Sequence, residues 1–353
     1  MAVLKDRLSD ADNRLYTGGV SSSWPTYSLV LPAYNEEGVI QELVTRLTRV
    51  MDLLDGDAEA IIVDDGSRDR TYELLVEATH KEPRLRVVKL SRNFGHQVAL
   101  TAGVDVSAGD AVIVLDADLQ DPPEVVLELA ARWREGYDVV YAVRDIREGE
   151  TRFKRATAAA FYRAFNRISE VKVPLDVGDF RLVDRRALDV FVRMRESNRF
   201  VRGMFSWIGL RQTGVLYRRH ERFAGETKYP LRKMLRFAAT GVISFSAAPL
   251  RAALNLGFLV SFVSFALAIW SLVVKFAGIY HVPGWTSIVL VTTFIGGVQL
   301  IVLGVIGQYI GSIHEEVKRR PLYVIGELEN FPDTPELPPR AVVVDRRIRA
   351  REY

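Results

Sequence analysis

The chain has 353 residues, and at about 150 residues per domain this length favours roughly two structural units and excludes one small module. Hydrophobic residues make up 48% of the chain and charged residues 26%, and 47 Lys or Arg against 44 Asp or Glu give a formal net charge of +3, which argues against extensive disorder and against a nucleic-acid partner. Cysteine is absent, so disulfides, thiol nucleophiles and cysteine-ligated metal centres are excluded.

Five short apolar runs in the N-terminal half predict the strands of a buried parallel sheet. They are residues 27–31, 60–63, 85–90, 111–115 and 139–143. Each has the length of a strand that is covered on both faces. The stretches between them predict helices at Glu36–Leu54, Arg70–Lys81 and Glu124–Arg134. The predicted fold class is therefore α/β, with a doubly wound and mostly parallel sheet.

Three of these strands end in polar, largely acidic runs. The runs are Pro32–Glu37 after the first strand, Asp64–Ser67 after the second and Asp116–Asp121 after the fourth. In doubly wound sheets, ligands bind at the carboxyl ends of the strands, so these runs predict the site. Neither the dinucleotide-binding glycine motif nor the P-loop motif is present, which makes dinucleotide oxidoreductases and P-loop NTPases poor candidates.

The acidic triplet Asp116–Asp118 stands out by its position. The same spacing of two aspartates recurs at residues 10–12 and 55–57, but only Asp116–Asp118 follows directly on a predicted strand, 111–115. Neighbouring carboxylates repel each other unless a cation intervenes, and Gln120 adds a neutral oxygen. Oxygen ligands of this kind suit Mg²⁺ or Mn²⁺. An acidic turn that caps a helix is the alternative.

Two long apolar runs near the C-terminal end predict a membrane hairpin. Ala252–Val274 and Phe276–His314 contain no Asp, Glu, Lys or Arg, and only Lys275 separates them. The first run would be about 34 Å long as a helix, against a hydrocarbon core of roughly 30 Å. We expect two spans, at about 252–276 and 285–313. A pair of buried core helices is the alternative.

Charged residues around the hairpin predict its orientation. Basic residues flank both runs on the outer side: Arg232, Lys233, Arg236 and Arg251 before the first, and Lys318, Arg319 and Arg320 after the second. By the positive-inside rule, we expect both long soluble portions, and with them both termini, to be cytoplasmic. No apolar stretch of signal-peptide type occurs near Lys5. Residues 229–246 have the pattern of an amphipathic helix at the membrane interface, with core packing as the alternative.

Six motifs in this order resemble those of family-2 glycosyltransferases. They are Leu31–Glu36, Val63–Ser67, Ser91–Gly95, Asp116–Pro123, Gly178–Leu182 and Arg222–Tyr229, and two membrane helices follow them. The resemblance covers about residues 27–320. It is closest to the polyprenyl-phosphate glycosyltransferases, the group that contains dolichol-phosphate mannose synthase and the bactoprenol glucosyltransferases. It implies a glycosyltransferase A-type fold followed by a two-helix transmembrane hairpin.

The resemblance also implies roles for individual residues. The donor nucleotide would be bound by Pro32, Tyr34, Asn35, Glu36, Asp65 and Asp116. The metal ion would be held by Asp116, Asp118 and Gln120. The acceptor phosphate would be bound by Arg144, Arg155, Arg222 and Lys228. Asp179 resembles the catalytic aspartate of the acceptor side, and it either removes a proton, orients the acceptor or binds a donor hydroxyl. A structural aspartate paired with Arg181 or with another neighbour is the alternative.

The activity implied is a metal-dependent hexosyltransferase that uses Mg²⁺ or Mn²⁺. It would transfer a sugar from a nucleoside-diphosphate sugar to a polyprenyl phosphate with inversion, at the cytoplasmic face of the membrane, and UDP-glucose is favoured as the donor. GDP-mannose-dependent mannosyl transfer, a processive polysaccharide synthase and a non-catalytic membrane scaffold with a nucleotide-binding domain are the alternatives. The lipid bilayer and a homo-oligomer, with a tetramer as one form, are the further partners expected.

These expectations divide the chain into five parts. They are an N-terminal arm (1–26), a cytoplasmic glycosyltransferase domain (27–225), an interfacial amphipathic segment (226–251), two transmembrane helices (252–314) and a cytoplasmic C-terminal tail (315–353).

Overall fold

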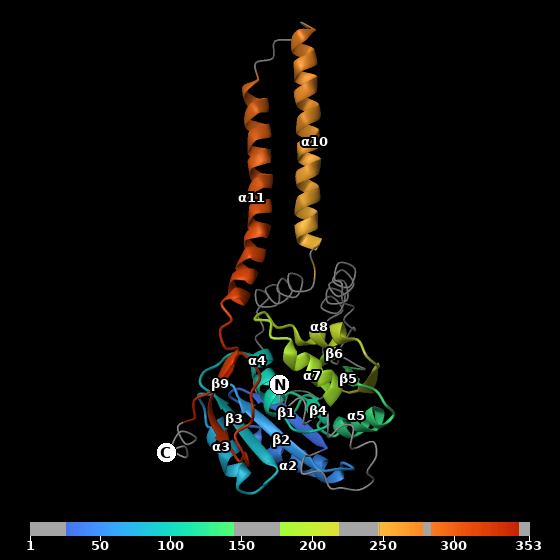
Figure 1. Ribbon diagram of the computed structural model, residues 1–353, viewed down its shortest axis with the longest axis vertical. Coiled ribbons are helices and arrows are strands. Elements are labelled where there is room, and N and C mark those ends of the chain that lie inside the picture. The colour runs from blue at the N-terminus through green and yellow to red at the C-terminus, as the bar shows by residue number, and fades with distance from the viewer. Residues whose placement is uncertain (1–25, 145–176, 219–245, 247, 278–283, 346–353) are drawn as a thin grey trace.

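The computed structural model describes residues 26–144, 177–218, 246, 248–277 and 284–345. Within these ranges, nine strands form one sheet in the order β7-β5-β6-β4-β1-β2-β3-β8-β9. Five of the eight strand pairings are parallel, and helices cover both faces of the sheet (Figure 1). The structure therefore confirms the predicted α/β fold with a mostly parallel sheet.

The first five strands lie within two residues of the predicted runs. The strands are β1 (Tyr27–Ala33), β2 (Ala58–Asp64), β3 (Leu85–Leu90), β4 (Ala111–Val114), β5 (Val139–Arg144), β6 (Val177–Asp184), β7 (Gln212–Tyr217), β8 (Tyr323–Glu329) and β9 (Ala341–Val343). The helices are α2 (Ile40–Leu53), α3 (Thr71–Thr79), α4 (His96–Val106), α5 (Val125–Arg134), α7 (Arg185–Arg193), α8 (Val201–Ile208), α10 (Ala248–Phe276) and α11 (Trp285–Val317).

Helix α2 begins four residues later than the sequence predicts. The expected start was Glu36, but the helix begins at Ile40. Asn35 has a φ of 54°, which is a left-handed conformation that turns the chain away from a helical path. The backbone N–H of Glu36 then donates to the hydroxyl of Thr71 at 2.8 Å. A hydrogen bond to the first residue of α3 therefore takes the place of a bond within the first turn of the predicted helix.

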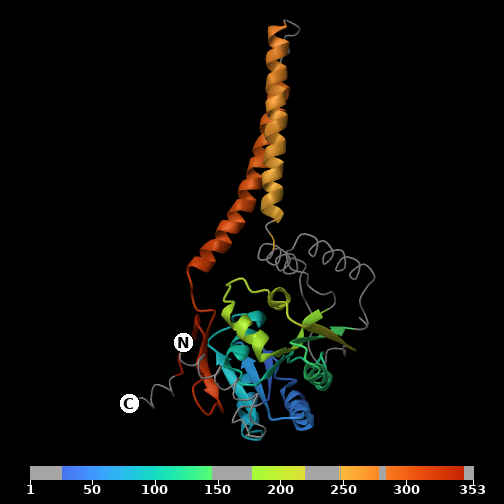
Figure 2. The ribbon, with the colours of Figure 1, turned by 45° about the vertical axis from the view of Figure 1, so that its right-hand side comes forward.

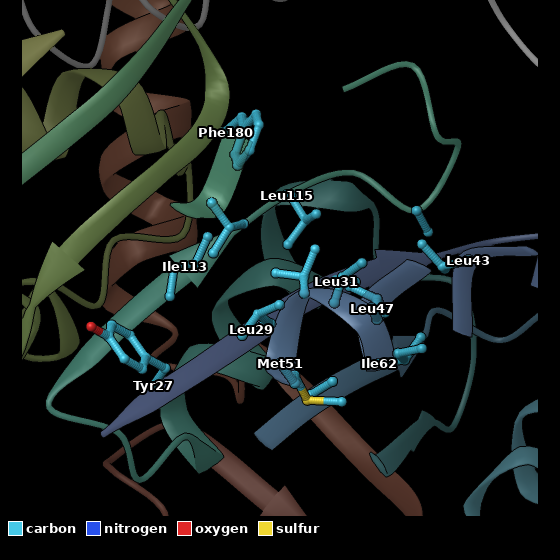
Figure 3. Close-up of a cluster of buried hydrophobic side chains, with 14 of the residues drawn as sticks. Tyr27, Leu29, Leu31, Leu43, Leu47, Met51, Ile62, Ile113, Leu115 and Phe180 are labelled. Carbon is cyan, nitrogen blue, oxygen red and sulfur yellow. The ribbon is translucent and has the colours of Figure 1, made fainter. Parts of the chain in front are cut away.

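Alternate side chains of β1 go to opposite faces of the sheet and fill two separate cores. Leu29 and Leu31 lie in one core with Leu47 and Met51 of α2 (Figure 3). Val30 lies in the other core, to which α4, α7, α8 and β8 contribute. A strand covered on both faces needs apolar side chains at every position, which explains the continuous apolar runs in the sequence. Each fully buried aliphatic side chain contributes about 1.5–3 kcal/mol.

After α11 the chain returns to the sheet. β8 pairs antiparallel with β3, with Leu328 opposite Val88, and β9 pairs parallel with β8 at the edge. Only residues 318–322 separate the end of α11 from the start of β8. Residues 315–353, predicted to be a cytoplasmic tail, contribute two strands to the sheet of the domain.

A buried ion pair connects β8 with α4 and with the loop after α7. The Asp105 carboxylate at the end of α4 is fully buried. It accepts hydrogen bonds from Arg195 Nη1 at 2.9 and 3.0 Å and from the Tyr323 hydroxyl at 2.7 Å. Burial raises the pKa of Asp105, while Arg195 and Tyr323 oppose that rise. Because the ionised Asp105 carboxylate is shielded from water, its negative charge must be stabilised by these two partners.

Helices α10 and α11 form a hairpin that projects from the domain (Figures 1 and 2). By length and composition, each is long and apolar enough to cross a membrane. Their large apolar side chains are exposed, for example Phe262 at 72% and Leu300 at 72%, which distinguishes them from buried core helices. The structure thus bears out two apolar helices after the domain. Most of the predicted interfacial segment 226–251 lies outside the described residues.

We predict that Asp105→Ala destabilises the domain by about 3–5 kcal/mol, because it leaves the Arg195 guanidinium buried without its partner charge. Tyr323→Phe removes one hydrogen bond and is expected to cost about 1 kcal/mol. Thermal unfolding of the full chain in detergent, followed by tryptophan fluorescence, measures both. Equal unfolding temperatures for Asp105→Ala and the unsubstituted chain would contradict the proposed contribution of this ion pair to stability.

Candidate active site

The pairing of β4 with β6 brings two distant aspartates to the same edge of the sheet. Val114 at the end of β4 lies opposite Arg181 of the antiparallel β6. Continuing this register by two residues places Asp116 opposite Asp179. The ends of β1 and β2 lie at this edge too, because both strands run parallel to β4. Residues from at least four strands therefore meet at one edge, as expected for an α/β ligand site.

Hydrogen bonds tie the loops after β1 and β2 together. The Asn35 N–H donates to Ser67 Oγ at 2.9 Å, and Asn35 Oδ1 accepts from the Arg68 N–H at 2.9 Å. Glu37 Oε2 accepts from the Arg70 N–H at 3.0 Å. Each loop therefore supplies backbone partners for the other. The shared contacts fix the relative position of two loops that the sequence predicts to bind the donor.

Asp65 holds a third loop in place. Its carboxylate accepts from the backbone N–H groups of Phe94 at 2.7 Å and Gly95 at 2.9 Å. Burial raises the pKa of Asp65, and these two donors partly offset the rise. Gly66 has a φ of 68°, and a side-chain carbon there would come within 2.6 Å of the Arg92 carbonyl carbon. The turn after β2 is thus packed directly on the loop after β3, which only glycine permits.

His96 lies between the two facing aspartates. Its Nε2 is 3.4 Å from Asp116 Oδ1 and 3.4 Å from Asp179 Oδ2. The surrounding protein opposes a charge on the imidazole, but the two carboxylates prevail and raise the pKa of His96 to about 9. The imidazole is therefore a cation at neutral pH in the metal-free site. It compensates part of the negative charge that Asp116 and Asp179 bring together.

Asp179 is buried and firmly bound by basic and polar side chains. Arg202 Nε donates to Asp179 Oδ1 at 3.0 Å, and Gln97 Nε2 donates to Asp179 Oδ2 at 3.0 Å. Burial alone would raise the pKa of Asp179, but Arg202 and His96 hold it well below its ordinary value. Arg181, the partner considered from the sequence, donates instead to the backbone carbonyls of Asp179 and Gly178. The carboxylate is therefore an anion that rarely accepts a proton.

Arg144 lies beside the acidic run that follows β4. Its Nη2 is 3.9 Å from Asp121 Oδ2, and its Nε donates to the Tyr217 hydroxyl at 3.3 Å. Tyr217 in turn donates to Asp121 Oδ1 at 2.5 Å. A side-chain carbon at Gly178 would come within 3.0 Å of the Arg144 guanidinium, so glycine lets the guanidinium lie close to the start of β6. Arg144 thus joins the same edge of the sheet.

The residues after β4 fit a divalent cation that is shared with a ligand. Asp116 Oδ1 is buried without a hydrogen-bond partner, and burial raises the pKa of Asp116 to about 6 despite the nearby His96. Asp118 lies two residues away, and its Oδ1 accepts from the Gln120 N–H at 3.1 Å. Among the described residues, no group of three His, Asp or Glu side chains could hold a metal by itself. Mg²⁺ is commonly bound by one or two carboxylates together with substrate phosphates, which suits this pair.

The remaining predicted donor residues lie at the same edge in different settings. Pro32 is buried in β1 opposite Val63 of β2, and Tyr34 follows it with 40% of its surface exposed. Glu36 is fixed through its backbone, as described for the loop above. Arg155, Arg222 and Lys228, the other predicted acceptor residues, lie outside the described residues. Their assignment stays a prediction.

Four residues at this edge were not singled out from the sequence: His96, Gln97, Arg202 and Tyr217. His96 and Gln97 directly follow the Ser91–Gly95 motif at the start of α4, so a wider reading of that motif would have included them. Arg202 lies in α8, a separate helix 23 residues after Asp179. A lone arginine at that distance gives no sequence signal for its ion pair.

We predict that Asp65→Asn loosens the loop after β3, because an amide nitrogen replaces one oxygen that accepts a backbone N–H. The expected cost is about 1–3 kcal/mol, with faster hydrogen exchange at Phe94 and Gly95. Asp64→Asn is the matched control. Asp64 Oδ2 is buried without a hydrogen-bond partner, so its neutralisation is expected to cost less. A larger loss for Asp64→Asn than for Asp65→Asn would contradict this assignment.

Comparisons with known proteins show to which family the chain is related. Residues 28–191 match the glycosyl transferase family 2 domain. YkcC, an uncharacterized glycosyltransferase of Bacillus subtilis, is 49% identical over 299 residues, which cover 85% of this chain and 93% of the relative. The SfII prophage-derived bactoprenol glucosyl transferase of Shigella flexneri is 39% identical over 298 residues, which cover 84% of this chain and 96% of the relative.

One of the solved structures that the chain matches is glucosyl-3-phosphoglycerate synthase from Mycobacterium tuberculosis. It is 23% identical, with a TM-score of 0.41, and the match covers 62% of this chain and 79% of that one. The extent and identity of the sequence matches decide the assignment. The chain belongs to glycosyl transferase family 2.

Proposed function

We propose that this glycosyltransferase transfers a sugar from a nucleoside-diphosphate sugar to a polyprenyl phosphate. The observation that carries the proposal is the convergence of acidic residues with Arg144 and Arg202 at one edge of the sheet. A nucleotide diphosphate with its cation needs the carboxylates, and an anionic acceptor needs the guanidinium groups. Relatives named bactoprenol glucosyl transferases, 38–39% identical to this chain, favour the same pair of substrates.

We assign the donor side of the reaction to the loops after β1, β2 and β4. Asn35, Glu36 and Asp65 belong to loops that bind one another, and Tyr34 adds an exposed aromatic ring for the nucleotide. Asp116, Asp118 and Gln120 would hold Mg²⁺ or Mn²⁺ against the diphosphate. When bound, this cation would offset the negative charge that develops on the leaving nucleotide.

In the proposed reaction, one phosphate oxygen of the acceptor forms a bond to the anomeric carbon while the bond from that carbon to the nucleoside diphosphate breaks. A single displacement of this kind inverts the anomeric centre. The second pKa of a phosphate monoester is about 6, so much of the acceptor is already a dianion at neutral pH. The acceptor therefore needs positioning by cationic side chains more than it needs a strong base.

Asp179 is assigned a positioning role in this scheme. Its carboxylate binds Arg202, Gln97 and His96. The positive charges of Arg202 and His96 keep it ionised. A group whose pKa lies well below its ordinary value is a weak proton acceptor near neutral pH. The arrangement therefore favours Asp179 as the group that orients Arg202 beside the acceptor, rather than as the general base.

The membrane hairpin places this chemistry at a lipid surface. α8, which carries Arg202, lies on the side of the domain from which α10 and α11 project (Figures 1 and 2). A polyprenyl chain is confined to the bilayer, so its phosphate is accessible at the headgroup plane. The basic residues that flank the hairpin favour a cytoplasmic catalytic domain in the inner membrane. Association into a homo-oligomer stays a prediction.

The identity of the sugar is decided by a panel of donors. Purified protein is incubated with undecaprenyl phosphate, Mn²⁺ or Mg²⁺ and either UDP-glucose, GDP-mannose or other sugar nucleotides, and lipid products are identified by mass. UDP-glucose is the donor favoured here, because the named relatives are glucosyl transferases. Product from GDP-mannose alone would move the assignment to mannosyl transfer, and no lipid product from any donor would refute the proposed reaction.

We predict that Asp118→Asn lowers the rate of transfer by about a hundredfold, because a neutral amide is a poorer ligand for the cation. Asp57→Asn is the matched control, since Asp57 belongs to the other aspartate pair near a strand and is exposed at the opposite edge of the sheet. The rate is measured with the preferred donor at several Mn²⁺ concentrations. An unchanged rate for Asp118→Asn would contradict the assignment of Asp118 as a ligand of the cation.

We predict that Asp179→Asn lowers the rate by about a hundredfold through misplacement of Arg202, with a raised KM for the acceptor. In Asp179→Asn and in the unsubstituted chain, the rate of transfer is expected to fall below about pH 6. This fall, the acid limb of the pH profile, reports protonation of the acceptor phosphate, whose second pKa is about 6. Rates with saturating donor between pH 5 and 9 test this. Loss of the acid limb in Asp179→Asn alone would instead identify Asp179 as the general base.

A further inference from the structure

The Arg340 guanidinium joins three separate parts of the chain. It donates to the Glu316 carboxylate at 2.7 Å and to the Ser197 hydroxyl at 2.7 Å. It also donates to the backbone carbonyls of Arg195 and Arg320. Only 12% of the Arg340 side chain is exposed. A planar guanidinium can satisfy several acceptors in a fixed geometry, so Arg340 acts as a rigid connection between these parts.

One of the joined parts is the end of the membrane hairpin. Glu316 is the penultimate residue of α11, and its second carboxylate oxygen accepts from the Ser197 N–H at 2.7 Å. Residues 318–322 then lead directly into β8, and the Leu322 N–H donates to the Arg340 carbonyl at 2.7 Å. The lower end of α11 is therefore bound both to the sheet and to the loop between α7 and α8.

That loop leads to the candidate active site. It follows α7 and includes Arg195, which is anchored on the buried Asp105, and it ends at α8. The N–H of Val201, the first residue of α8, donates to Gln97 Oε1 at 3.1 Å, and the next residue, Arg202, binds Asp179. Contacts at both ends of this loop, joined by its backbone, thus connect the end of α11 with the acceptor side of the site.

We infer that Arg340 is a positioning residue that sets the height and tilt of the active site above the bilayer. The inference rests on the proposed function, since it concerns delivery of a membrane-bound acceptor phosphate. The hairpin is fixed by the bilayer, and the site must meet a phosphate that moves only in the headgroup plane. Without the Arg340 contacts, the domain keeps its fold but turns about the link 318–322, so the site meets the lipid phosphate less often.

Two acceptors separate this role from a merely structural one. The full chain, Arg340→Ala, Arg340→Lys and Arg193→Ala are reconstituted in phosphatidylethanolamine and phosphatidylglycerol vesicles with UDP-glucose and Mn²⁺. The acceptor is either undecaprenyl phosphate in the bilayer or citronellyl phosphate, a short isoprenoid phosphate, in solution. Arg340→Ala is expected to lower kcat/KM for the bilayer acceptor by about tenfold and that for the soluble acceptor by less than about twofold.

The control variants sharpen this comparison. Arg340→Lys is expected to be intermediate, because an ammonium group keeps the charge but cannot reach all of the acceptors. Arg193→Ala removes the same charge from an exposed position at the end of α7, and we expect no change with either acceptor. An equal loss of activity with both acceptors, or no loss with the bilayer acceptor, would overturn the inference.

A second readout does not depend on catalysis. The chain has no cysteine, so Asp57→Cys gives a single site for a fluorescent dye at the far edge of the domain. The efficiency of energy transfer from this dye to a lipid probe reports the distance between the domain and the bilayer. Its distribution is expected to shift and broaden in Arg340→Ala and to stay constant in Arg193→Ala. Unchanged energy transfer in Arg340→Ala would overturn the inference. If the unsubstituted chain glycosylates neither acceptor, the proposed function fails, while energy transfer still decides the role of Arg340.

Discussion

Negative charge is crowded at the carboxyl edge of the sheet, and each carboxylate there must be compensated within the protein or by a ligand. Asp179 is compensated by Arg202, Gln97 and His96. Asp116 shares His96 but retains a buried oxygen without a hydrogen bond. The two aspartates face each other through the β4–β6 register, yet one is satisfied and the other is not. This difference supports the proposal that a cation binds beside Asp116, while Asp179 orders the Arg202 guanidinium.

The N-terminal half of the fold could be predicted because its strands are buried on both faces. Such strands are apolar at most positions, and Leu29, Val30 and Leu31 show this directly, with neighbours going to opposite cores. The start of α2 could not be predicted in the same way. Asn35 directly precedes the predicted helix Glu36–Leu54, but its left-handed backbone and its bonds to the next loop serve tertiary structure instead of capping a helix. Local capping preference yields to contacts between loops.

The candidate site likewise contains residues that could be predicted from the sequence and residues that could not. Asp65, Asp116 and Asp118 follow strands directly, so their place at the edge could be inferred from the sequence. The partners of Asp179 could not. Arg202 comes from a later helix, and only the tertiary packing of α8 on α4, through Val201 and Gln97, brings it to the carboxylate. Sequence motifs identify the charged groups that need compensation, whereas the folded chain decides which group supplies it.

The return of the chain to the sheet after the hairpin has a consequence for biosynthesis. β3 is bordered by β2 on one side and by β8 on the other, and β8 lies more than 230 residues later in the chain. During translation, the edge of β3 stays unpaired until both apolar helices have left the ribosome. Pairings so distant in sequence form slowly, and an open strand edge invites association with other chains. Completion of the sheet is therefore coupled to synthesis of the two helices, and the last strands cover an edge that would otherwise be prone to aggregation.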